Sequence, residues 1–213
     1  MARDYLKEIK LKYHNLYKDK ERWEQLSLRV DPLLESIDAI KNIDSQDIRD
    51  ELLRGSIIGI VSCIEGYIRL AVKDIIDFGE PFSTNSELIS VNKQVKRHIA
   101  NDSAVSKGDL IAHSVRLNTI SDIDSLLSCV LGIDFWPSIQ INNVLDDESL
   151  TLAEYNPDLF DDLERLFSFR HMFAHELASD VYIEIDDVDY FVSAGFLFMH
   201  VTEEMIDTCL FGD

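Results

Sequence analysis

Residues 45–78 read SQDIRDELLRGSIIGIVSCIEGYIRLAVKDIIDF, the longest stretch with helical periodicity in the chain. Apolar side chains recur at three- and four-residue spacing from Leu52 to Phe78, which is typical of a helix with an apolar stripe. Gly55, Gly59 and Ser62 leave small surfaces along it, so we expect another helix to pack closely there. The pattern predicts that residues 45–78 form the central core helix of a nearly all-helical protein.

Helical patterns also precede and follow this stretch. The pattern predicts an amphipathic helix from Asp4 to Arg29, and then Asp31 as the cap and Pro32 as the first residue of a short helix that ends at Ile40. After the loop that begins at Gly79, we expect three short helices and, later, two long ones. Their expected ranges are 87–101, 107–117, 121–131, 159–177 and 186–210.

The middle of the chain, residues 87–155, is less regular, and we interpret it as an insertion within a single domain that covers residues 1–213. The cluster Phe135-Trp136-Pro137 is expected to be a packing contact that anchors this segment. Residues 181–185 have an extended pattern. The fold class expected is therefore all-α: a helical bundle with an inserted helical segment before the helix over 159–177.

Composition indicates an ordinary globular protein of 213 residues with 46% hydrophobic and 28% charged residues. No uncharged apolar run reaches the roughly 20 residues of a membrane-spanning helix, and the first residues lack the apolar segment of a secretory signal. We therefore expect no membrane association and a cytoplasmic location. Cys63, Cys129 and Cys209 lie inside apolar helical patterns, as expected of reduced core cysteines.

The net charge of −20 is unevenly distributed. Residues 1–30 carry eight basic and five acidic residues, a net of 8 − 5 = +3, whereas residues 141–213 carry eighteen acidic residues against only Arg165 and Arg170. An acidic surface favours solubility, and it also fits a docking face for a basic partner.

Three cationic side chains interrupt the apolar stripe of the helix expected over 159–177: Arg170, His171 and His175. The two histidines are spaced i, i+4 and so lie on one face, and Arg170 is about 140° round the axis from His175. A titratable imidazole beside a fixed guanidinium suits proton transfer at a phosphodiester. This trio is the candidate functional site.

The motif Arg170-His-Met-Phe-Ala-His175 resembles the Arg-x4-His signature of the HEPN superfamily, with His171 as the polar second residue. The likeness extends to the glutamate-bearing helix around Glu65 and to the aromatic-rich last helix. It implies a helical bundle that dimerises with two motifs facing each other across the interface. It also implies metal-independent cleavage of RNA, without a cofactor, by a toxin or an antiviral defence effector.

Carried onto this chain, the resemblance makes His175 the general acid or base and Arg170 the group that binds the scissile phosphate. His171 orients the phosphate or assists proton transfer, and Glu65 holds Arg170 or a histidine in place. RNA is the expected substrate, and an antitoxin or other regulatory protein is an expected partner. Some relatives carry a tyrosine two residues after the motif histidine that an antitoxin modifies. Here that position is Leu177, which argues against such silencing, and Tyr182 lies too far along.

Three alternatives compete with the ribonuclease hypothesis. His171, His175 and Glu176 could ligate zinc, but Met172 stands where a zinc peptidase needs its glutamate. A non-catalytic HEPN-like adaptor could use the trio to bind a nucleotide or a protein. The trio could also be a satisfied polar network in the core, in which case Arg170 and His175 would be buried.

Overall fold

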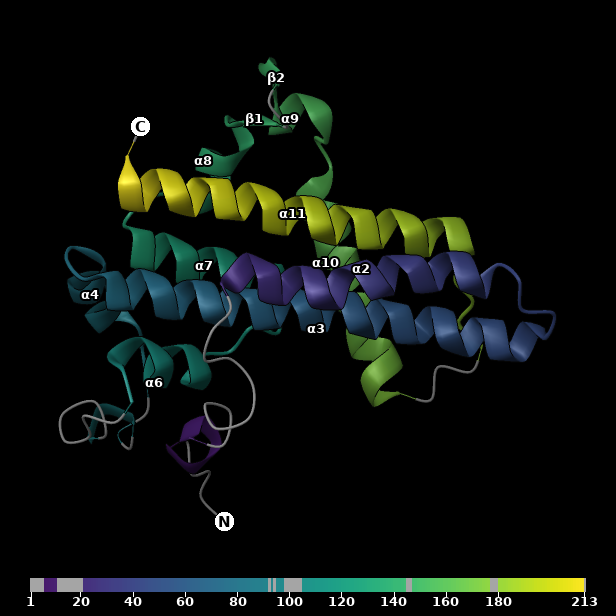
Figure 1. The fold of residues 1–213 in the computed structure, drawn as a ribbon, viewed down its shortest axis with the longest axis horizontal. Coiled ribbons are helices and arrows are strands. Elements are labelled where there is room, and N and C mark those ends of the chain that lie inside the picture. Colours follow the sequence, from purple (N-terminus) through teal and green to yellow (C-terminus); the bar gives the residue numbers. More distant parts are fainter. Residues whose placement is uncertain are drawn as a thin grey trace.

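Helices make up most of the chain in the computed structural model, which describes residues 6–10, 21–91, 93, 95–97, 105–144, 147–176 and 180–212 (Figure 1). The elements are α2 (Arg22–Ile40), α3 (Gln46–Phe78), α4 (Phe82–Asn85), η1 (Ser86–Leu88), α6 (Lys107–Ser114), α7 (Ile120–Leu131), α8 (Phe135–Gln140), β1 (Asn143–Val144), β2 (Asp147–Thr151), α9 (Leu152–Tyr155), α10 (Leu159–His175) and α11 (Ile185–Phe211). The expected all-α class is confirmed.

The central helix is α3, as its periodicity predicts. Helices α2, α6, α7, α10 and α11 all contact it, and α2 and α11 run along its length (Figure 1). Its stripe from Ile57 to Ile75 is fully buried, and Gly79 ends the helix at φ 118°, a conformation that glycine adopts readily. By length and composition alone α3 could cross a membrane. Its apolar stripe is instead covered by the other helices, as in a core helix.

Close packing of α2 and α11 on α3 depends on two glycines. A Cβ atom added to Gly59 of α3 would lie 3.2 Å from Leu33 Cδ1 of α2, which confirms that α2 and α3 approach each other closely at that position. Gly55 has no neighbour within 4 Å and Ser62 is exposed, so the expectation is wrong for those two. Gly195 of α11, which the sequence did not single out, would place a Cβ 2.8 Å from Ile60 Cγ1.

The first helices differ from the prediction. Pro32 does not start a new helix but lies inside α2, which is continuous from Arg22 to Ile40. Pro32 is exposed, so the Leu28 carbonyl that loses its hydrogen bond can be solvated. Val30 and Ile37, 0% and 1% exposed, anchor the helix on both sides of the proline. Burial against the core therefore outweighs the proline signal.

The expected helix from Asp4 to Arg29 is also interrupted. Glu21 is extended, with φ −64° and ψ 155°, and helix begins only at Arg22. Residues 6–10 form a separate helical piece beside α6, away from the axis of α2 (Figure 1). Ile9 packs there with Val95, Val105 and Leu110 in a small second core. The remaining residues of the expected helix before Glu21 lie outside the described residues.

The middle segment contributes to the main core. Capping boxes at Ser106 and Thr119 start α6 and α7, close to the predicted starts. Phe135 is fully buried, and the Trp136 ring contacts Phe160 with centroids 4.7 Å apart, which confirms the predicted packing contact. The hairpin of β1 and β2 was not predicted, and part of the expected helix 87–101 lies outside the described residues. The division into core and insertion stays a prediction.

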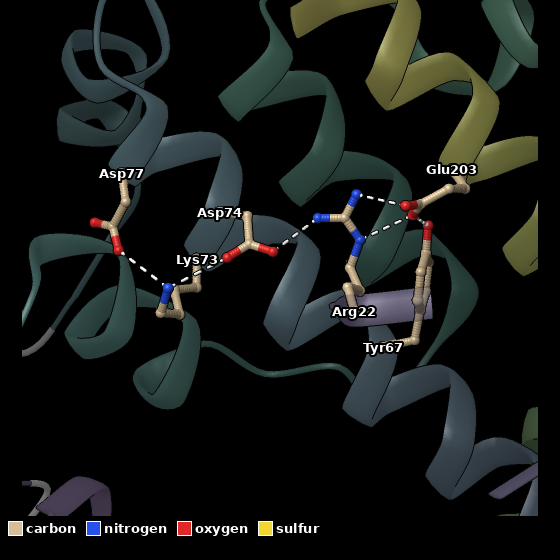
Figure 2. A network of polar contacts seen from close by, with 6 residues as sticks. All are labelled: Arg22, Tyr67, Lys73, Asp74, Asp77 and Glu203. Atoms are coloured by element: carbon tan, nitrogen blue, oxygen red, sulfur yellow. Dashed lines mark hydrogen bonds and ion pairs between the residues drawn. The ribbon is translucent and has the colours of Figure 1, made fainter. Parts of the chain in front are cut away.

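A partly buried polar network joins α2, α3 and α11 (Figure 2). Arg22 donates to Glu203 through Nε and Nη2, both at 2.8 Å, and through Nη1 to Asp74 at 2.9 Å. The Tyr67 hydroxyl donates to Glu203 Oε2 at 2.6 Å. Burial and the neighbouring Glu203 carboxylate raise the pKa of Tyr67 well above its usual value, so the hydroxyl keeps its proton as donor.

Candidate functional site

The apolar stripe of α10 positions the motif. Leu159, Leu163, Leu166 and Phe167 are buried in the main core, whereas the residues from Ser168 to His175 are half-buried or exposed. The helix ends at His175 because Glu176 is extended, with φ −117° and ψ 154°. The last two turns of α10 therefore carry the motif out of the core, and Leu177 lies outside the described residues.

Stacked aromatic rings support these last turns. Phe169 stacks on Phe173 one turn later, with centroids 5.7 Å apart, and meets Phe191 of α11 edge-on at 5.6 Å. The last helix thus contributes an aromatic side chain, Phe191, to the support of the motif, in agreement with the aromatic-rich last helix that the resemblance implies. These contacts hold the backbone that carries Arg170 and the two histidines.

Glu65 of α3 holds Arg170. The guanidinium donates from Nη2 to Glu65 Oε1 at 2.8 Å, and each side chain is 21% exposed. A guanidinium has five N–H donors, and no described residue accepts from the other nitrogens of Arg170. Glu65 therefore orients the cation while leaving it donors for another anion, which is one of the two roles expected for this carboxylate.

His171 and His175 form a pair of exposed imidazoles. Their ring centroids are 5.0 Å apart, as the i, i+4 spacing predicts. Among the described residues no hydrogen bond joins either ring to Arg170, which faces α3. The structure thus brings Arg170 to Glu65 and His171 to His175 at one end of one helix. The exposed His175 contradicts the alternative of a satisfied core network for the histidines, whereas Arg170 is half-buried and paired with Glu65.

The zinc alternative gains no third ligand. Within the part of the chain that the structure describes, no group of three or more histidine, cysteine or acidic side chains is arranged to hold a metal ion. The three cysteines are free, and burial raises the pKa of each thiol, which favours the protonated and poorly nucleophilic form.

A second polar contact on α10 was missed by sequence reasoning. Asp162 is only 6% exposed, and it accepts a short hydrogen bond from the Tyr190 hydroxyl of α11. This hydrogen bond and partial burial raise the pKa of Tyr190. The signal that could have found it is an acidic residue inside an apolar stripe. Asp162 lies two turns before the motif and ties α10 to α11.

The segment after the motif contacts α3. Arg54 donates from Nη2 to the Val181 carbonyl at 3.1 Å. Residues 181–184 are neither helix nor strand, so the extended pattern produces no sheet, and Ile185 begins α11. Tyr182 is 71% exposed.

A family model described as RiboL-PSP-HEPN matches residues 24–208. The chain belongs to this HEPN family. The match runs from α2 into α11 and so includes the motif helix, Glu65 and the middle segment. No curated protein and no solved structure matches the chain.

Proposed function

We propose that this HEPN protein is a metal-independent endoribonuclease. The observation that carries the proposal is the exposed pair of imidazoles at the end of α10, on the same last turns of that helix as Arg170, whose guanidinium Glu65 holds. An imidazole titrates near neutral pH and can take or give a proton, and a guanidinium binds phosphate oxygens with a fixed geometry. Together they offer what phosphodiester cleavage requires without a metal ion.

The proposed reaction is attack of a ribose 2′-oxygen on the adjacent phosphorus. A base removes the 2′-hydroxyl proton, the O2′–P bond forms, the P–O5′ bond breaks, and an acid protonates O5′. The products are a 2′,3′-cyclic phosphate and a 5′-hydroxyl. His175 acts as acid or base, His171 orients the phosphate or assists the proton transfer, and Arg170 stabilises the charge on the phosphate oxygens.

The proposal includes a homodimer. Because the histidines are exposed at one end of α10, a second copy can bring its own motif opposite them and complete a cleft at the interface. Sedimentation analysis at a range of concentrations tests this assembly, and a wild-type protein that cleaves RNA as a monomer would remove it from the proposal.

Substitution of the motif tests catalysis. Arg170→Ala and His175→Ala are each expected to lower the rate of RNA cleavage in EDTA by at least about 100-fold, since each removes a group that acts in the transition state. The measurement is the appearance of fragments with 2′,3′-cyclic phosphate ends. Arg165→Ala and His200→Ala are controls for residue type, and circular dichroism checks the fold. Cleavage at the wild-type rate by both motif variants would overturn the assignment.

We further propose that the activity serves a toxin or antiviral defence effector in the cytoplasm, held in check by an antitoxin or another regulatory protein. Expression of the wild-type chain is expected to arrest growth of a host cell, and the His175→Ala variant is expected to be tolerated. If both arrest growth equally, the toxicity does not come from this site.

The acidity of residues 141–213 favours a second candidate function, a non-catalytic adaptor that docks a basic protein. The two functions differ in one result. An adaptor leaves mixed RNA intact in EDTA and binds a basic partner with an affinity that falls as salt rises, whereas the ribonuclease cuts the RNA.

A further inference from the structure

Basic side chains gather around α6 although the whole chain is strongly acidic. Residues 6–10, 93, 95–97 and 105–119 form what we call the basic lobe, held together by the small core around Ile9 and Leu110. Its basic members are Lys7, Lys10, Lys93, Lys96, Arg97, Lys107 and Arg116, and its acidic members are Glu8 and Asp109. The net charge of these residues is 7 − 2 = +5.

One face of α3 connects the basic lobe to the motif. Arg69 donates to the backbone carbonyls of Ala112 and Val115, at the end of α6. Glu65, which holds Arg170, is one turn earlier on the same face. The C-terminal turns of α10 and the basic lobe thus border the same stretch of α3, and they lie on the same side of it in Figure 1.

This stretch of α3 is open. Ser62 and Gly66 are exposed, and a Cβ atom added to Gly66 would have no neighbour within 4 Å. Arg116, directly after Val115, is also exposed, and among the described residues nothing forms a hydrogen bond or ion pair with it. An exposed cation with no acidic partner among the described residues therefore follows directly after a carbonyl that Arg69 binds, and Arg69 is one helical turn along α3 from Glu65.

The other side of α3 is covered by α11, whose first turns carry Asp186, Asp187 and Asp189 (Figure 1). A polyphosphate strand is repelled from that side and attracted to the basic lobe, because surface charges act over about 10 Å at moderate salt. The charges flanking the motif therefore define one direction along which a strand can extend.

We infer that single-stranded RNA bound at the motif runs along the Ser62–Gly66 face of α3 to Arg116 and onto the basic lobe. This inference rests on the proposed ribonuclease function and adds its substrate path. Arg116 binds a phosphate several nucleotides from the scissile bond, so it contributes to affinity for long RNA and not to the chemistry. It also explains how a chain with a net charge of −20 binds a polyanion.

Binding is measured on the His175→Ala protein with a labelled single-stranded RNA. Adding Arg116→Glu is expected to weaken binding by at least about 10-fold, and Arg116→Ala is expected to reduce the slope of log affinity against log salt by about 0.7, the value for one phosphate contact. Arg165→Ala is the matched control, because Arg165 is 65% exposed on α10 beside the acidic α11. In cleavage assays, KM for long RNA rises with Arg116→Glu, and the effect disappears for RNA too short to reach Arg116.

Wild-type affinity and KM in the Arg116→Glu protein, or an equal loss in the Arg165→Ala protein, would overturn the inferred path. A midpoint temperature of thermal unfolding equal to that of the wild-type protein verifies that these substitutions of exposed residues leave the fold intact. Failure of the proposed function looks different: the wild-type protein then leaves every RNA uncut, whatever residue stands at position 116.

Discussion

At the scale of single residues, Glu65 has two opposing effects on Arg170: it fixes the orientation of the guanidinium, and it lowers the net positive charge of the site. A carboxylate beside the guanidinium offsets part of the positive charge that a phosphate would meet. The pair uses one guanidinium nitrogen, Nη2, at 2.8 Å, so the remaining N–H groups of Arg170 can still donate hydrogen bonds to another anion. Because both side chains are about four-fifths buried, removal of Glu65 leaves Arg170 without its described partner, and the guanidinium can then adopt other rotamers. We therefore regard Glu65 as a positioning residue.

Substitution of Glu65 separates positioning from simple support of the fold. Glu65→Ala is expected to lower kcat by up to about 100-fold, since a displacement of about 1 Å at a reacting group has an effect of that size. Glu65→Gln keeps an oxygen that accepts from Arg170, so it should restore most of kcat, and its KM should be no higher because the neutral amide does not offset the positive charge of Arg170. Steady-state kinetics on both variants provides the measurement. Equal kcat values in Glu65→Ala, Glu65→Gln and the wild type would rule out the positioning role.

Arg170, His171 and His175 could be found from the sequence because they interrupt an apolar stripe, whereas Glu65 was implied by the family resemblance. Arg116 has no such signal. It lies in a polar stretch, and its position depends on hydrogen bonds from Arg69 to two carbonyls 43 and 46 residues away. Contacts of that separation follow from the packing of α6 on α3, which helical periodicity alone does not specify.

At the scale of helices, the contact between α3 and α11 depends on the absence of a side chain at Gly195. A Cβ there would lie 2.8 Å from Ile60 Cγ1 and 3.3 Å from Ile64 Cδ1, both on the buried stripe of α3. Neither isoleucine can move easily, since both are 0% exposed. A larger residue would force the two helices apart.

Alanine at two glycines should have opposite effects on stability. Gly195→Ala is expected to lower the free energy of unfolding by about 1–3 kcal/mol, the usual effect of overpacking. Gly55→Ala should raise it by about 0.5–1 kcal/mol, because alanine favours helix and a Cβ at Gly55 meets nothing within 4 Å. Urea unfolding followed by circular dichroism measures both values. A stabilised Gly195→Ala protein would show that α11 does not pack on α3 at this distance.

Local signals predicted the long helices well and their junctions poorly. Periodicity gave α3 and α11 nearly to their ends, because each has a continuous buried stripe. It divided α2 at Pro32, where burial of Val30 and Ile37 keeps the helix intact. It also joined residues 6–10 to α2, although Glu21 is extended. Such junctions are decided by which core a segment reaches, and local propensity contains little of that information.

At the scale of the whole molecule, charge is divided between two sides of α3. The basic lobe and the motif lie on one side, and the acidic α11 lies on the other (Figure 1). Arg22 connects the helices across this division through Glu203 and Asp74 (Figure 2). Its hydrogen-bonded carboxylate partners raise the pKa of Arg22 despite its burial. This partly buried network is screened by salt much less than the exposed charges are.

Salt is therefore expected to act on folding and on RNA binding in opposite directions. Raising NaCl from about 0.05 to about 0.5 M shortens the range of electrostatic interaction, which relieves the self-repulsion of a chain with a net charge of −20. The urea midpoint should rise, because the Arg22–Glu203 network is retained while repulsion between exposed carboxylates weakens.

The same change in salt should lower the affinity of the His175→Ala protein for single-stranded RNA, with a slope of log affinity against log salt of about −0.7 for each phosphate contacted. Urea titrations and RNA binding measured over one series of salt concentrations test both parts. An RNA affinity that does not change with salt would mean that the basic lobe contacts no phosphates, and an unchanged urea midpoint would mean that acidic self-repulsion contributes little to the stability of the fold.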